Sequence, residues 1–152
     1  MVEYLKSVTK ECHEKMLEQM NNSICIINER DGRNEIGLFC KIKNKNEYIP
    51  ILLINKNINN DNYQDKINVL INNENKIIEL DNILYKNNNI SMIKIKKNYN
   101  FVKLVEIDNK LWENESEMYF YNESIYIIQY NNKNDILISY GVIKEINNNK
   151  LN

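Results

Sequence analysis

The sequence predicts a mainly β fold, with an N-terminal α-helix followed by a six-stranded antiparallel Greek-key barrel and a C-terminal β-hairpin. Three observations predict it. Residues 3–20 carry apolar side chains at intervals of three and four, the period of an amphipathic helix. From Ser23 onward, short segments rich in isoleucine and valine alternate with loops rich in asparagine, aspartate and lysine. Six strand-length segments at this spacing are typical of a small barrel.

The predicted helix ends at Asn21-Asn22, and no proline or glycine interrupts it. Its apolar stripe consists of Leu5, Val8, Cys12, Met16 and Met20. The only histidine of the chain, His13, lies between charged neighbours, and no metal-ligating residue type follows it at a spacing suited to a site. We therefore interpret His13 as a surface residue.

The barrel strands are predicted from short apolar runs, with an Asp31-Gly32 hairpin turn between the first two. The six ranges are 23–28, 35–43, 48–54, 66–72, 76–80 and 90–96. Two further strands, 124–130 and 135–146, form the predicted hairpin. We divide the chain into a helix (1–22), a barrel (23–97), a connecting segment (98–123) and a hairpin region (124–152).

Length and charge limit the classes of function. A chain of 152 residues with 43% hydrophobic residues can bury a core of its own. Twenty basic and 21 acidic residues give a formal net charge of -1, without the excess of lysine and arginine that nucleic-acid binders need. We expect no nucleic-acid partner, and we interpret the one basic cluster, Lys94, Lys96 and Lys97, as a solvated strand face.

The cysteines indicate a reducing compartment. Cys12, Cys25 and Cys40 show no C-x-x-C spacing and lie inside apolar patterns, which is typical of buried free thiols. With one histidine in the chain, we expect no metal site and no cofactor. Residues 1–20 lack the apolar core of a signal peptide, and no apolar run reaches membrane-spanning length. We expect a cytoplasmic protein without a membrane partner.

Several segments resemble a divergent lineage of trypsin-like serine peptidases, over about residues 23–146. Residues 37–42 (G-L-F-C-K-I) resemble the family's G-F-F-C-K-I, and residues 50–57 (P-I-L-L-I-N-K-N) resemble P-V-L-I-T-N-N-H. Further matches are K-I-I-E-L-D at 76–81, S-I-Y-I-I-Q-Y-N at 124–131 and I-S-Y-G-V-I-K-E-I at 138–146, with a helical lead-in at 10–20. The resemblance implies that the barrel is the first of two and that the hairpin opens an incomplete second barrel.

The same resemblance implies that the catalytic triad is lost. The family's histidine, the general base, falls on Asn57, and the aspartate that orients it falls on Asn89. An amide side chain cannot accept the hydroxyl proton, nor does it stabilise an imidazolium ion. The segment with the nucleophilic serine would lie downstream of Asn152. We expect no catalytic residues, and we name Asn57 and Asn89 as the degenerate triad positions.

These observations favour a catalytically inactive trypsin-like peptidase homologue that acts as a protein-binding or structural module. Its partner would be another protein or a second copy, bound through the edge of hairpin 124–146. Two alternatives stay open: part of a serine peptidase completed by a separate chain, and an unrelated β-barrel binding module. An enzyme with Cys40 as nucleophile is disfavoured, because a thiol in an apolar strand has a raised pKa. The aromatic residues Trp112 and Tyr119-Phe120-Tyr121 are expected to pack between barrels.

Overall fold

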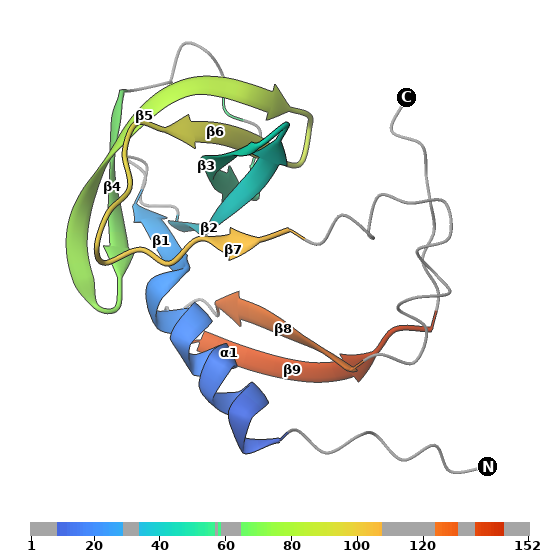
Figure 1. Ribbon diagram of the computed structural model, residues 1–152. Helices are drawn as coiled ribbons and strands as arrows, with labels where there is room; N and C mark the ends of the chain where they lie inside the picture. Colours follow the sequence, from blue (N-terminus) through green and yellow to red (C-terminus); the bar gives the residue numbers. More distant parts are fainter. Residues whose placement is uncertain are drawn as a thin grey trace. The chain divides into compact units, whose positions relative to one another are not determined.

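The computed structural model describes residues 9–28, 34–56, 58, 65–107, 124–130 and 136–144. The chain divides into two compact units. One unit is residues 10–107, with helix α1 and strands β1 to β7, and the other contains strands β8 and β9 (Figure 1). Each unit is described by itself below.

Six strands of the first unit form a closed antiparallel barrel. They are β1 (Ile24–Asn28), β2 (Asn34–Asn44), β3 (Glu47–Ile54), β4 (Lys66–Ile71), β5 (Glu74–Lys86) and β6 (Ser91–Ile95). The sheet runs in the order β1-β4-β5-β6-β3-β2, and β2 pairs back onto β1. Within it, the spatial order β4-β1-β2-β3 is that of a Greek key. The predicted six-stranded antiparallel Greek-key barrel is confirmed.

The core of the barrel comes from the alternation of side chains along each strand. Every second residue points inward, so cross-strand partners such as Phe39 and Leu52 meet inside the barrel. Gly37 also belongs to an inward row, and a Cβ atom there would lie 2.8 Å from Cys25 Sγ and 2.9 Å from Leu52 Cδ1. The side chains of Cys25 and Leu52 therefore fill the space next to Gly37, where a larger residue has no room.

Most strand boundaries differ from the prediction by one or two residues, and the structure shows the cause of two differences, at the end of β5 and at the end of β4. Strand β5 continues to Lys86, beyond the predicted end at residue 80, and its register with β6 shifts on both sides of Ile83. Such irregularities let one long strand bend around a barrel. The strand was predicted to end at residue 80 because the polar pair Asp81-Asn82 follows. Strand β4 ends at Ile71 because Asn72 and Asn73 both adopt positive φ, 49° and 60°. Two such residues form the tight hairpin turn to β5.

Helix α1 spans Lys10–Asn22, and its predicted start at residue 3 lies outside the described residues. Thr9, which directly precedes it, is a preferred N-cap type; residues 1–8 lie outside the described part of the chain. His13 is exposed, as predicted. Cys12 is exposed too, so its predicted burial is wrong: Met16, one turn later, is the only buried residue of the helix. The predicted burial of Cys25 and Cys40 is confirmed.

A segment of residues 98–104, here called the strap, joins the helix to the barrel. Ser23, fully buried, donates its hydroxyl proton to the Lys103 carbonyl at 2.7 Å, and the Lys103 amide donates to Asn22 O at 2.9 Å. Lys103 Nζ lies 2.7 Å from a Glu18 carboxylate oxygen. The strap then leads into β7 (Val105–Glu106), which pairs in parallel with β2. Four strap residues pack against the barrel core: Tyr99, Phe101, Val102 and Leu104.

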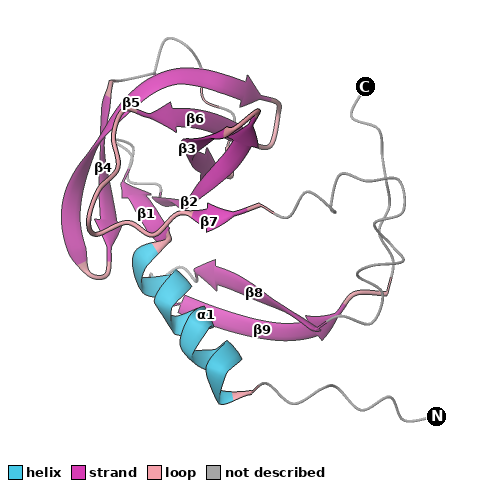
Figure 2. Ribbon diagram, in the orientation of Figure 1, coloured by secondary structure: helices cyan, strands magenta, loops and turns pink. Residues whose placement is uncertain are grey.

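The second unit contains a two-stranded antiparallel sheet of β8 (Ser124–Tyr130) and β9 (Ile136–Val142), drawn as magenta arrows in Figure 2. The predicted hairpin is thus present, although its second strand ends at Val142 and not at residue 146. Val142 is paired with Ser124, the first residue of β8, and residues 145 and 146 lie outside the described part of the chain. Burial raises the pKa of the Tyr126 phenol in this hairpin.

Some predicted features lie outside the described residues. They are Asn57, the Asp31-Gly32 turn, Trp112 and the aromatic residues 119–121.

Candidate functional site

The candidate site is the junction between the loop after β3 and the start of β6, where the neighbours of Asn57 contact the strand that follows Asn89. Ser91, the first residue of β6, is fully buried and lies opposite Ile54 in the β3–β6 pairing. Its hydroxyl donates to the Lys56 carbonyl at 2.7 Å and accepts a hydrogen bond from the Ile58 amide at 3.0 Å. One serine therefore fixes the residues on both sides of position 57, close in sequence to Asn89.

The turn that carries Asn89 is shaped by a neighbouring asparagine. Asn87 Oδ1 accepts hydrogen bonds from the amides of Asn89, at 2.8 Å, and Ile90, at 2.9 Å. The backbone amide of Asn87 in turn donates to the Ile90 carbonyl oxygen at 3.0 Å. A side-chain oxygen that binds backbone amides two and three residues later is the mechanism of an Asx turn. Asn89 itself is exposed, and its backbone amide serves this turn.

A second contact joins the same two segments. Lys86, the last residue of β5, donates from Nζ to the Ile58 carbonyl at 3.5 Å. The hydrogen bonds described at the junction involve the Ser91 hydroxyl, backbone groups, the Asn87 side chain and the Lys86 ammonium group, and none of these bonds involves an imidazole or a carboxylate. Hydroxyl activation needs an adjacent proton acceptor, and the described residues provide none here. Ser91 donates its proton to a backbone carbonyl, which fits a positioning role.

The buried thiols are poor nucleophiles. Burial raises the pKa of Cys40 from 9.0 to about 11. Burial also raises the pKa of Cys25 to about 12, although a hydrogen bond with the Gly37 backbone opposes the shift. Because the thiolate is the reactive form, both thiols are inert near neutral pH. The third thiol, Cys12, is exposed on helix α1.

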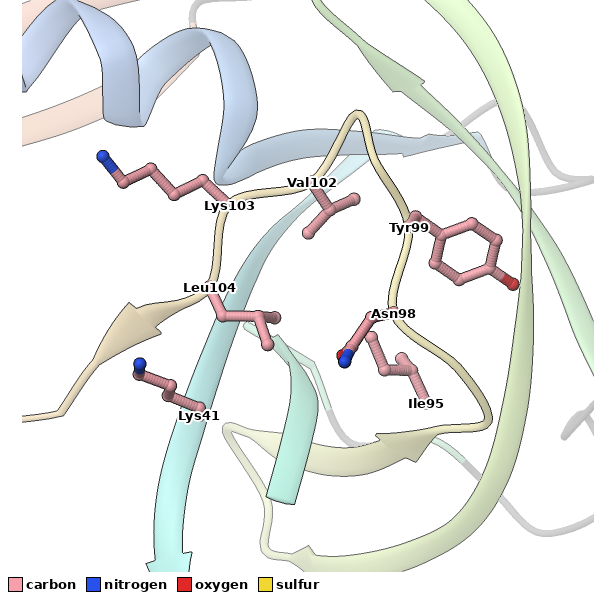
Figure 3. Close-up of a pocket in the computed structure, with 7 residues that line it drawn as sticks. All are labelled: Lys41, Ile95, Asn98, Tyr99, Val102, Lys103 and Leu104. Atoms are coloured by element: carbon pink, nitrogen blue, oxygen red, sulfur yellow. The ribbon is translucent and has the colours of Figure 1, made fainter. Parts of the chain in front are cut away.

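A separate cavity of about 370 Å³ opens beneath the strap, between Ile95 at the end of β6 and Lys41 of β2 (Figure 3). Figure 3 shows Val102, Leu104 and Asn98 directed into this space. The two lysines that line the cavity each interact with a residue outside it. Lys103 pairs with Glu18, and Lys41 Nζ lies 4.6 Å from the centroid of the Tyr48 ring. The interior is therefore mainly apolar, with one amide.

The basic cluster of the sequence lies beside carboxylates. Lys94 Nζ is 3.7 Å from Asp81 Oδ2, and Lys97 Nζ is 3.3 Å from Glu79 Oε2. Lys96 and Lys97 are exposed, in agreement with a solvated surface. Among the described residues, no group of three or more histidine, cysteine, aspartate or glutamate side chains is placed to hold a metal ion. Within the same part of the chain, no helix is long and apolar enough to cross a membrane.

The role of Ser91 was not predicted from the sequence. Its only signal is a polar residue at an inward position of an apolar strand, because buried hydroxyls almost always have hydrogen-bond partners. The partners themselves, Lys56 and Ile58, are more than 30 residues away and leave no trace in the pattern. The comparisons with known proteins add no relative: no family model, curated protein or solved structure matches this chain.

Proposed function

We propose that this protein is a non-catalytic relative of trypsin-like serine peptidases that acts as a protein-binding or structural module. The observation that carries the proposal is the Ser91 junction. Ser91 holds Lys56 and Ile58, the neighbours of Asn57, against the strand that starts two residues after Asn89. The two segments that resemble the base and orienting segments of the family therefore meet, and each has an asparagine at the key position.

Neither the histidine nor the buried thiol of Cys40 is a good substitute for the triad. The only histidine of the chain, His13, is exposed on helix α1. Cys40, with a pKa of about 11, would be a thiolate in roughly one molecule in ten thousand at pH 7. A separate chain that completed a peptidase would have to supply the imidazole as well as the serine, and this makes the completed-peptidase alternative less favourable.

Hairpin β8–β9 supports the binding role. A two-stranded ribbon alone is marginal in water, and an open strand edge can pair with another chain. Strand β8 pairs with β9 alone among the described residues, and large apolar side chains of the hairpin are exposed. We therefore place the interaction surface of the module on this hairpin, with another protein or a second copy of the chain as the partner.

The test of the non-catalytic assignment is active-site labelling. The purified chain is treated with a fluorophosphonate, and intact mass is measured, in parallel with turnover of a panel of peptide and ester substrates. We expect no stoichiometric adduct and no turnover. An adduct on one residue that is lost when only that residue is replaced, for example in Ser91→Ala, would overturn the proposal. Active trypsin serves as the positive control for the reagent.

A further inference from the structure

The hairpin of the second unit has one face with three exposed large apolar side chains. Cross-strand register places Ile125, Ile127 and Leu137 on the same face, because Ile125 is opposite Gly141, Ile127 opposite Ser139 and Leu137 opposite Gln129. Ile127 and Leu137 are each 48% exposed, and Ile125 is 36% exposed. This face holds no charged residue.

The absence of charge extends to both strands. The fourteen residues of β8 (S-I-Y-I-I-Q-Y) and β9 (I-L-I-S-Y-G-V) include no lysine, arginine, aspartate, glutamate or proline. Natural proteins protect open strand edges with lysines, prolines or inward-pointing charges, and this hairpin has none of these. An uncharged edge of this kind is complementary to another uncharged strand, and it gives no attraction to a basic or acidic peptide.

We infer that the occupant of this edge is a second copy of the same chain, joined by antiparallel pairing of β8 with β8 across a two-fold axis. This inference rests on the proposed function and specifies its partner. Two copies would make a four-stranded sheet, which meets the minimum of three or more strands for an independently stable sheet. A two-fold interface is also self-complementary, so one strand suffices to specify it.

Strand β8 is the better of the two edges for this pairing. Ile125, Tyr126, Ile127 and Ile128 are consecutive β-branched or aromatic residues, the types that favour strands. Strand β9 is interrupted by Ser139 and Gly141. Antiparallel pairing centred on Ile127 places Ile127 opposite its own copy and Tyr126 opposite Ile128 of the other copy.

The experiment uses the full chain in sedimentation velocity over a range of concentrations, with two matched variants. Ile127→Lys would place two like charges opposite each other on the axis, whereas Leu137→Lys puts the same charge on the same face, at equal exposure, on the outer strand. We expect a dimer for the parent chain and for Leu137→Lys, and a dissociation constant at least about tenfold weaker for Ile127→Lys. A parent chain that is monomeric at high micromolar concentration overturns the inference, as do equal shifts in the two variants.

A cross-linking experiment avoids dependence on a destabilising charge. In a Cys12→Ser background, which removes the one exposed thiol, Ile127→Cys should form a disulfide dimer under mild oxidation, because directly opposed Cα atoms lie within disulfide range. Leu137→Cys should not, since three strand spacings, about 14 Å, would separate the two copies of that position. Efficient cross-linking through residue 137 and not through residue 127 would contradict pairing at β8. Neither result bears on peptidase activity, so this inference and the non-catalytic assignment can fail independently.

Discussion

The barrel and the hairpin differ in whether the edges of their strands are paired with neighbouring strands. In the barrel every strand from β1 to β6 has two antiparallel neighbours, and closure leaves no open edge among them. In the hairpin each strand has one neighbour among the described residues, and several large apolar side chains are exposed. A closed barrel can be complete as a single chain, whereas an open two-stranded sheet gains stability from further strands. We therefore propose the hairpin, and not the barrel, as the interaction surface of this protein.

The largest expected effect comes from adding a side chain where two barrel strands meet. Gly37→Val should destabilise the barrel by about 3 kcal/mol or more, because its Cβ alone would lie 2.8 Å from Cys25 Sγ. The matched change in the hairpin is Gly141→Val, whose Cβ would be 3.8 Å from Ile125 Cγ1, an ordinary contact. Thermal unfolding monitored by circular dichroism measures both. A Gly37→Val variant as stable as Gly141→Val would contradict the claim that the barrel interior has no room for a side chain at Gly37.

The next effect concerns the Ser91 junction. Ser91→Ala leaves the Lys56 carbonyl and the Ile58 amide without their shared partner, so we expect a loss of about 2 kcal/mol in the free energy of unfolding. The control is Ser139→Ala on the exposed side of β9, which should change stability by less than about 0.5 kcal/mol. Urea titration of both variants gives the values. Equal and small losses would mean that the junction does not depend on the Ser91 hydroxyl.

A third effect appears at alkaline pH. The pKa values of buried Cys25 and Cys40 are raised to about 12 and about 11, so above pH 9 the unfolded chain loses thiol protons that the folded chain keeps. The unfolded state then binds fewer protons, and stability falls as pH rises from about 9 toward 11. Each thiol contributes a slope of up to about 1.4 kcal/mol per pH unit in that window.

Denaturant titrations between pH 8 and pH 11 measure this dependence. Replacing Cys40 with alanine should make the fall in stability shallower. Identical pH profiles for the parent chain and Cys40→Ala would contradict the burial of that thiol as the cause.

The smallest effect is local. Tyr48 donates its hydroxyl hydrogen to Glu106 Oε1 at 3.1 Å, a contact between the β2–β3 hairpin and β7, and this hydrogen bond and the carboxylate charge raise the Tyr48 pKa above 10.0. In Glu106→Gln the charge is removed, so Tyr48 should ionise at lower pH than in the parent chain. An NMR pH titration of the tyrosine ring signals measures it. An unchanged midpoint would show that β7 does not bring Glu106 to Tyr48 in solution.

Side-chain periodicity predicted most of the fold but not its irregular parts. Short apolar segments such as 48–54 and 66–72 predict strands because they are rich in residue types that favour strands and are bounded by polar loops. Strand β7 was missed because two residues carry no periodicity, and its parallel pairing to β2 depends on the path of the strap. The length of β5 was missed because its bend follows from a shifted register.

The candidate site could be predicted only in part. Resemblance of short segments pointed to Asn57 and Asn89, and the structure brings the neighbours of both together through Ser91. The contact itself joins residues far apart in sequence, and a single sequence holds no signal for such a pair. The exposure of Cys12 was missed for a related reason. The helical stripe gives the apolar side of α1, but not how many turns of that side reach the barrel.

Hydrogen exchange at two protein concentrations tests the contrast between barrel and hairpin most directly. Amide protection is measured by NMR or mass spectrometry on the parent chain in dilute and concentrated samples. We expect barrel amides such as those of Phe39 and Ile93 to be equally protected in both samples, and amides of β8 to become protected only as concentration rises. Strong protection of β8 that does not depend on concentration would contradict the account, because the hairpin would then be complete within one chain.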